Sequence, residues 1–383
     1  MLPGAVAFNG PGSFPGAPTL RSVLGDAGPG TASEWPGAVD FDTGSGAFAA
    51  ADRLLYVGSN GHRRVAVATA AGPTSTWRRV LRGPSTGGAH VAAAASGSRS
   101  AAVFGTFERG GLGHVYLVRQ TGASWRVSAR GRIRSVSVGV NRAGDVLVAW
   151  DRSGTIEARF WYAGSRRLSP VSRLGRVNAA AHLSVALGSG RRAIVAWVDQ
   201  RVSEGNTGQR ATVMATARRA DTGFLPKARV LERFPDTAIP GGVGVASAFT
   251  SDGRGVVAWS GAAAVRASLV SGRAFGAAQD LAAAPAGGGF GLSGVAVSSA
   301  GKAAVTLVAP VTGDSNQVLV APLAAGADTF APAEAVSEPV PFLLRASAAF
   351  DRSDRLVAAW ANVPARTVEL AVRQSPPTAF GGQ

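Results

Sequence analysis

Polar residues that directly follow short apolar runs are the parts of this sequence that could bind a ligand or do chemistry. They are Glu108, Arg109, Asp151, Arg152, Asp199, Arg201, Glu204, Asn206 and Asn362. Arginine binds carboxylates, sulfates and phosphates through a planar fork of N–H donors. Two carboxylates roughly 5 to 10 Å apart can cleave a glycosidic bond, and Asp151 with Asp199 is the pair to which that role would fall. Either role requires a fold that brings these residues to one surface.

A repeated unit predicts that fold. A turn residue, an apolar run and a bulky end recur along the chain, as in GDVLVAW (144–150), RRAIVAW (191–197) and DRLVAAW (354–360). The ends of these runs are Gly58, Phe104, Trp150, Trp197, Trp259, Leu307 and Trp360. Neighbouring ends lie 46 residues apart at the closest (58 to 104) and 62 at the farthest (197 to 259). This period is the size of a four-stranded propeller blade.

Further strands can be placed in each unit. Before each turn lies a run of small apolar residues, and after each bulky end come a polar loop, a third strand and a Gly/Ser/Thr turn before an outer strand. The pattern predicts one all-β domain over residues 1–383, a seven-bladed β-propeller of four-stranded antiparallel blades with rows of Trp and Phe between them. In this frame Gly144 and Asp145 form a hairpin turn, and Val146 to Trp150 form a second strand.

The two ends of the sequence bear on closure of the ring. The last unit stops where its outer strand should begin, and AVAFNGPGSF (5–14) aligns without gaps on AVRQSPPTAF (371–380). An N-terminal strand, with residues 17 to 23 as the candidate, is expected to complete the C-terminal blade. The alternative is that the chain is cut from a longer array of repeats.

The units also resemble tandem repeats of large proteins from high-GC actinobacteria, with the pattern G-x-A-x-x-A-W, then V-x-A-x-R, then F-G-x-x-Q. The copy most similar to this pattern is ASLVSGRAFGAAQDL (267–281). The resemblance implies export, and therefore a location outside the cell or in its envelope, but it names no ligand. The stretch TSDGRGVVAW (250–259) is superficially similar to the sialidase box S-x-D-x-G-x-x-W, but its spacing differs, and a tight hairpin is the better interpretation.

Composition excludes several classes of site. The sequence has no cysteine, so disulfides and thiolate metal sites are absent, and its histidines show no metal-binding spacing. No run is long enough to span a membrane. The net charge is +16, yet all but two of the 39 basic residues are arginine, which indicates a coding bias more than a partner. Arg130, Arg132 and Arg134 alternate without interleaved aromatic residues, so nucleic acid is not an expected partner.

Three functions fit this pattern. The leading hypothesis is a non-enzymatic, monomeric binding or scaffold module without cofactor or metal, which recognises a protein or glycan through the loops that follow the second strands. The loop at 198–210 is longer than its counterparts and is interpreted as a flexible recognition loop. The second hypothesis is a glycoside-cleaving enzyme that uses acidic residues at the channel mouth, and the third is arginine-driven polyanion binding.

Overall fold

The computed structural model describes residues 4–5, 46–50, 54–59, 65–70, 78–82, 89–96, 98–106, 113–127, 131–178, 180–202, 209–220, 222–234, 243–261, 264–283, 291–311, 315–341, 343, 346–350, 354–362 and 367–373. Within these residues the regular structure is β-strand apart from one 3-10 turn at Ser189–Arg191. No helix in the described ranges is long and apolar enough to cross a membrane.

The described strands form seven antiparallel sheets, numbered here in chain order. Sheet 1 is β2 (Gly46–Ala50), β3 (Leu54–Ser59), β4 (Val65–Ala70) and β5 (Arg78–Arg82), and sheet 2 is β6 (Ala89–Ser96), β7 (Arg99–Thr106), β8 (Val115–Arg119) and β9 (Ser124–Arg126). Sheet 3 is β10 (Ile133–Val140), β11 (Val146–Arg152), β12 (Thr155–Trp161) and β13 (Ser172–Arg176). Sheet 4 is β14 (Ala180–Leu187), β15 (Ala193–Val202), β16 (Gln209–Arg219), β17 (Gly223–Phe224) and β18 (Arg229–Phe234). Sheet 5 is β19 (Val245–Phe249), β20 (Gly255–Ser260), β21 (Ala264–Ser271), β22 (Ala274–Phe275) and β23 (Gln279–Ala283). Sheet 6 is β24 (Gly291–Val297), β25 (Ala303–Pro310), β26 (Ser315–Leu323), β27 (Glu334–Ala335) and β28 (Val340–Pro341). Sheet 7 is β29 (Ala346–Phe350), β30 (Leu356–Asn362) and β31 (Thr367–Arg373), with β1 (Gly4–Ala5) at its outer edge.

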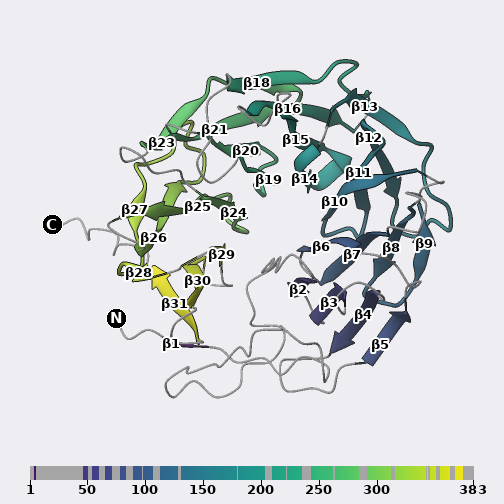
Figure 1. Cartoon of the computed structure of the whole chain (residues 1–383), viewed down its shortest axis with the longest axis horizontal. Helices are drawn as coiled ribbons and strands as arrows, with labels where there is room; N and C mark the ends of the chain where they lie inside the picture. Colours follow the sequence, from purple (N-terminus) through teal and green to yellow (C-terminus); the bar gives the residue numbers. More distant parts are fainter. Residues whose placement is uncertain are drawn as a thin grey trace, which may run out of the picture.

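The sheets stand around a ring, as in a propeller (Figure 1). The first strand of each sheet lies innermost, and these strands contact one another in the order β2, β6, β10, β14, β19, β24 and β29. The prediction of an all-β fold with several four-stranded antiparallel sheets is therefore confirmed, and sheets 4, 5 and 6 each have a fifth short strand paired with their third strand.

The core lies between neighbouring sheets, because second strands such as β11 and β20 are covered on both faces. In β11, Val146, Val148 and Trp150 pack with sheet 2, while Leu147 and Ala149 pack with sheet 4. This double burial explains why the second strands appear in the sequence as continuous apolar runs and not as alternating ones. Trp150, Trp197 and Trp259 are all fully buried, which confirms the predicted row of tryptophans.

Tight hairpins join the first and second strands, as predicted. Gly144 has φ +86°, and the neighbouring amide of Asp145 donates to the side-chain oxygen of Asn141 at 3.0 Å. Gly253 has the same φ in the corresponding turn of sheet 5, where only glycine is free of steric strain. The stretch 250–259 is thus a hairpin followed by strand β20, as its spacing indicated.

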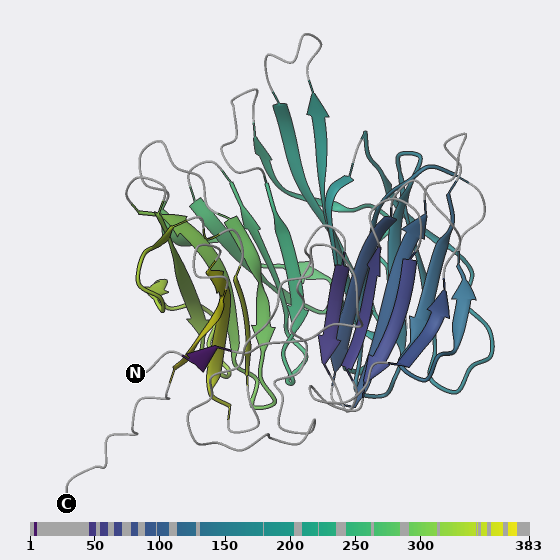
Figure 2. The same cartoon turned by 60° about the horizontal axis from the view of Figure 1, so that its bottom comes forward.

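Two details differ from or extend the expectations. The described residues of the predicted loop at 198–210 are strand, because β15 and β16 stay paired as far as Val202 and Gln209 and project as a hairpin (teal, top of Figure 2). Once the chain leaves the ring, pairing is maintained by backbone hydrogen bonds and does not need apolar residues. At the chain ends, β1 pairs with β31 through Gly4 and Leu370, whereas residues 17 to 23 lie outside the described residues.

Arginines join the sheets to one another through the main chain. Arg119 donates to the carbonyl of Trp161 at 2.9 Å, Arg192 to that of Gly253 at 2.9 Å, and Arg229 to that of Phe275 at 2.9 Å. Each bond connects one sheet to the next. Part of the arginine excess therefore has a structural role that a coding bias alone does not explain.

Candidate ligand-binding cleft

A buried carboxylate lies at the centre of the candidate site. Glu157 of β12 is paired in register with Trp150 of β11 and with Arg173 of β13, so the three side chains share one face of sheet 3. The indole N–H of Trp150 donates to Glu157 Oε2 at 3.1 Å, and the Arg152 guanidinium donates to Oε1. The Glu157 side chain is only 2% exposed, and Arg173 Nε lies 4.0 Å from Oε1.

The backbone around Arg152 holds its side chain in place. Ser153 and Gly154 both have positive φ, 51° and 85°, in the two-residue hairpin that joins β11 to β12. A Cβ added to Gly131 would lie 2.7 Å from Cγ of Arg152, so the arginine stem packs directly on that glycine. The guanidinium is thereby directed toward Glu157.

A shallow cleft opens beside this pair. It has a volume of about 420 Å³ and adjoins a hollow of about 300 Å³. Together, named the Arg152 cleft, they are lined by Arg152, Thr155, Glu157, Val171, Arg173, Leu174, Gly175, Arg176 and Pro226. The lining has three guanidinium groups and one carboxylate, and the Arg173 side chain is 77% exposed. This arrangement can attract and bind an anion.

Sheet 5 also has an indole, a carboxylate and a guanidinium bonded together, but these groups come from different strands than in sheet 3. The indole of Trp259 donates to Glu232, which also binds Arg266. Here the glutamate belongs to β18 of the preceding sheet, and Arg266 is the residue paired with the tryptophan. The hydrogen bond to Asp280, at 2.6 Å, is the main cause of the raised pKa of Arg266, and it outweighs the lowering caused by burial.

At Trp197 the carboxylate is missing. Met214 is the residue paired with Trp197, at the position that Glu157 occupies in sheet 3. Gly175 of β13 is at the position in sheet 3 that corresponds to Glu232 of β18 in sheet 4. The buried indole nitrogen of Trp197 consequently has no hydrogen-bond partner among the described residues. A Cβ on Gly175 would lie 2.9 Å from Cζ2 of Trp197, so this glycine allows the indole to pack against the wall of the Arg152 cleft.

Of the predicted residues whose side chains the structure describes, only Arg152 lines the cleft. Asp151 is fully buried, and its Oδ1 accepts the N–H of Gly154 at 2.8 Å. The expectation that Asp151 is presented to a ligand is therefore wrong, since its carboxylate stabilises the hairpin. Asp199 accepts the backbone N–H of Asn178 at 2.7 Å, and Arg201 is exposed on the projecting hairpin.

The other predicted residues cannot be placed with their side chains. Glu108, Arg109, Glu204 and Asn206 lie outside the described residues, and Asn362 ends β30 with its side chain outside them. Within the described ranges no group of three or more His, Asp or Glu residues could hold a metal ion.

Sequence reasoning missed Glu157, Arg173 and Arg176. A signal for Glu157 was present, because the two-residue turn at Ser153 and Gly154 fixes the register of β11 and β12 and so pairs Trp150 with Glu157. The outer strand offered no comparable signal, since a bulge interrupts its pairing between Ile156 and Glu157.

Comparisons with known proteins give no family. No family model matches the chain, and no curated protein matches it. Among solved structures, a polysaccharide lyase of the PL25 ulvan lyase family is 8% identical over 90% of this chain and 95% of its own, with a TM-score of 0.47. A lectin of Aleuria aurantia in complex with Fucα1-6GlcNAc is 13% identical over 76% of this chain and 91% of its own, with a TM-score of 0.40. A prolyl endopeptidase is 11% identical over 91% of this chain, which spans about half (51%) of that protein, with a TM-score of 0.45. Likenesses this distant transfer no activity to the chain.

Proposed function

We propose that this protein is a non-catalytic binding module that recognises an acidic glycan through the Arg152 cleft. The observation that carries the proposal is the convergence of Arg152, Arg173 and Arg176 on one cleft whose single carboxylate is already engaged. A uronate carboxylate or a sulfate matches the paired donors of arginine. All three arginines line the hollow of about 300 Å³, which lies at the lower end of the range of small-ligand sites, and Arg152 and Arg173 also line the adjoining cleft of about 420 Å³.

The use of the nearby carboxylates favours binding over hydrolysis. Glycoside cleavage needs two carboxyl groups that can act as acid and as base or nucleophile. Glu157 is held by Trp150 and Arg152, Asp151 caps a hairpin, and Asp199 bonds Asn178. The described carboxylates near the cleft are thus occupied with structural bonds.

The proposal includes the architecture that forms the cleft. The seven sheets are taken as seven propeller blades in one domain, closed by β1 as the outer strand of the last blade. The pairing of Gly4 with Leu370 and the succession of inner strands support this. Closure would hold the sheets at a constant angle and so keep the cleft open in the free protein.

The test compares two arginines at the same position of neighbouring sheets. Arg176 is paired with Thr155, and Arg233 with Thr212, yet only Arg176 lines the cleft. Binding of a short uronic acid oligosaccharide, measured by isothermal titration calorimetry, should weaken roughly tenfold or more in Arg173→Ala/Arg176→Ala, because each charge-assisted hydrogen bond contributes about 1.5 to 3 kcal/mol.

Arg233→Ala is the matched control and should bind as the unchanged protein does. A neutral oligosaccharide of equal length should bind neither protein. Equal affinity in both variants, or preference for the neutral sugar, would remove the cleft as the site.

A further inference from the structure

The face of the ring opposite the Ser153 hairpin carries dense positive charge. Here the first strand of each sheet turns into the second, and the third into the fourth; we call its part over sheets 2 to 4 the turn face. Its exposed arginines are Arg99, Arg142, Arg166, Arg167, Arg191 and Arg219. In the described residues of these turns the one acidic side chain is Asp145, which is buried. The described turn face therefore has a large excess of cations.

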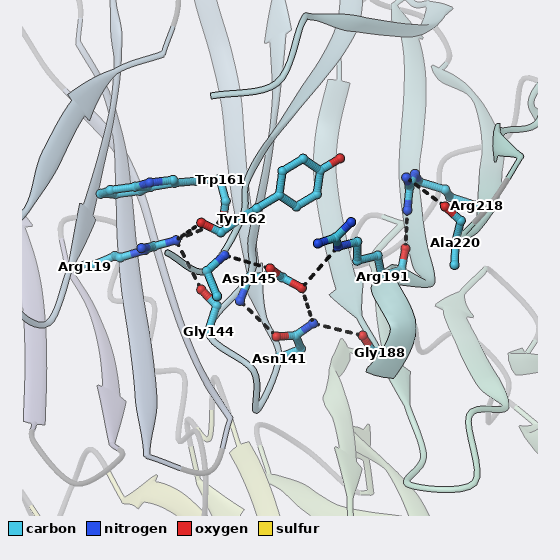
Figure 3. Close-up of polar contacts among 11 residues, drawn as sticks. Arg119, Asn141, Gly144, Asp145, Trp161, Tyr162, Gly188, Arg191, Arg218 and Ala220 are labelled. Atoms are coloured by element: carbon cyan, nitrogen blue, oxygen red, sulfur yellow. Dashed lines mark hydrogen bonds and ion pairs between the residues drawn. The ribbon is translucent and has the colours of Figure 1, made fainter. Parts of the chain in front are cut away.

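Aromatic rings, of which Phe160 and Trp161 are buried, lie against three arginines of this face. The Arg119 guanidinium is 3.7 Å from the ring centre of Trp161, that of Arg191 is 4.3 Å from Tyr162, and that of Arg218 is 4.7 Å from Phe160. Figure 3 shows Arg119 and Arg191 on either side of Asp145, next to Trp161 and Tyr162. Phe160 and Tyr162 stack at 5.5 Å, so rings and guanidinium groups form a continuous set across sheets 3 and 4.

Several contacts hold Arg191 in one orientation. Its backbone has φ +61°, which is unusual for a residue with a side chain, and its carbonyl accepts a hydrogen bond from Arg218. Its Nε lies 3.8 Å from Asp145 Oδ2, and Asp145 is itself fixed by Asn141 at 3.2 Å and by the amide of Ala163 at 2.8 Å (Figure 3). The Arg191 side chain nevertheless remains 52% exposed. A guanidinium held in this way loses little entropy when a ligand binds.

We propose that the turn face binds single-stranded nucleic acid, with phosphates at the exposed arginines and bases stacked on the Arg191 guanidinium and on Trp125. Trp125 is 37% exposed and meets the edge of Trp161 at 6.0 Å. The Trp125 ring and the exposed Arg191 guanidinium suit unpaired bases, because every base offers a flat face. Nucleic acid is not expected from the sequence, because Arg130, Arg132 and Arg134 lack aromatic neighbours. The fold instead places aromatic rings beside a different set of arginines.

Two other polyanionic partners fit this surface less well. A membrane would require several exposed apolar side chains. Of the large hydrophobic residues that are exposed in the described part of the chain, Trp125 lies on the turn face, whereas Val171 lines the Arg152 cleft and Val311 directly follows β25 of sheet 6. A sulfated glycan would use the charges but has no planar groups to stack.

The test measures binding of a fluorescein-labelled oligothymidylate of about 16 nucleotides by anisotropy. The variant Arg142→Ala/Arg166→Ala/Arg191→Ala should lose about tenfold or more in affinity. The slope of log affinity against log salt concentration should become less steep by about 2, because three phosphate contacts are lost. Trp125→Ala should lose about fivefold with little change in slope. Arg191→Lys should weaken binding and keep the slope, since lysine retains the charge without the plane.

The cleft variant Arg173→Ala/Arg176→Ala is the control and should bind the oligonucleotide normally, which separates this proposal from the glycan site. Circular dichroism verifies the fold of each variant. Absence of binding would overturn the proposal, as would an unchanged affinity in the triple variant. It would also be overturned if a sulfated polysaccharide bound as tightly as the oligonucleotide and its affinity did not change in Trp125→Ala.

Discussion

Replacing Glu157 by glutamine should weaken the fold and strengthen anion binding at the same time. The carboxylate accepts bonds from Trp150 and Arg152 on its two oxygens, whereas glutamine keeps one acceptor and turns an N–H₂ group toward the other donor. Loss of a hydrogen bond to a charged group costs about 1.5 to 3 kcal/mol. Because the Arg152 side chain is 30% exposed and water can replace part of the bond, we expect a loss of about 2 kcal/mol.

The expected gain in binding follows from the charge of the lining. Glutamine leaves three guanidinium groups without an opposing carboxylate. One unit charge about 8 Å from a bound anion, at an effective dielectric constant near 20 and with salt screening, changes binding by about 1 kcal/mol, or roughly fivefold.

Urea unfolding followed by tryptophan fluorescence gives the stability, and calorimetry with the uronic acid oligosaccharide gives the affinity. Glu338→Gln, at an exposed position, is the control and should change stability by less than about 0.5 kcal/mol. A stability loss below about 0.5 kcal/mol in Glu157→Gln, or weaker binding of the acidic oligosaccharide, would contradict these expectations.

Three further predictions concern the packing and hydrogen bonding around Trp197 and the hydrogen bonds of Asp252. Gly175→Ala should lower the free energy of unfolding by about 1 to 3 kcal/mol, because its Cβ would lie 2.9 Å from the fully buried Trp197. The control Gly294→Ala meets no atom within 4 Å and should lower it by less than about 0.5 kcal/mol. Equal losses in the two variants would contradict this prediction. Met214→Gln places an acceptor opposite the unpartnered indole N–H of Trp197 and should be at least as stable as Met214→Leu in urea unfolding; a deficit above about 1 kcal/mol would show that the indole is already satisfied. Burial raises the pKa of Asp252, but hydrogen bonds from Thr250 and Arg254 lower it by more, so its contribution to stability is present above the ordinary value near 4 and is lost as the pH falls below it. Asp252→Asn should therefore flatten the acid side of a thermal-unfolding profile, and a profile of unchanged shape would count against these hydrogen bonds.

The parts of the fold that were predictable are those set by local chemistry. Bulky ends such as Trp150 and Trp259 marked the second strands because a residue packed between two sheets must be large and apolar. Gly144 marked a hairpin because its positive φ excludes most other residues. Both signals can be found within a few residues of sequence.

The site was less predictable because it depends on register and on neighbouring sheets. Asp151 follows Trp150 and looked accessible, yet the next residues turn so tightly that its carboxylate is used by Gly154. The ring beside Arg119 is Trp161 at the end of β12, 42 residues away in the sequence, and the ring beside Arg191 is Tyr162, which directly follows β12. No local pattern reports such a contact.

The hydrogen bonds from arginines to main-chain carbonyls allow the sequences of neighbouring sheets to differ. An acceptor on the backbone is present whatever side chain a neighbour carries, so a change in one sheet does not demand a matching change in the next. Neighbouring sheets can then differ in sequence until they share little more than a turn and a bulky residue, while the bonds between them remain. Surfaces on successive units, such as the cleft and the turn face, are free to specialise independently on a frame that stays the same.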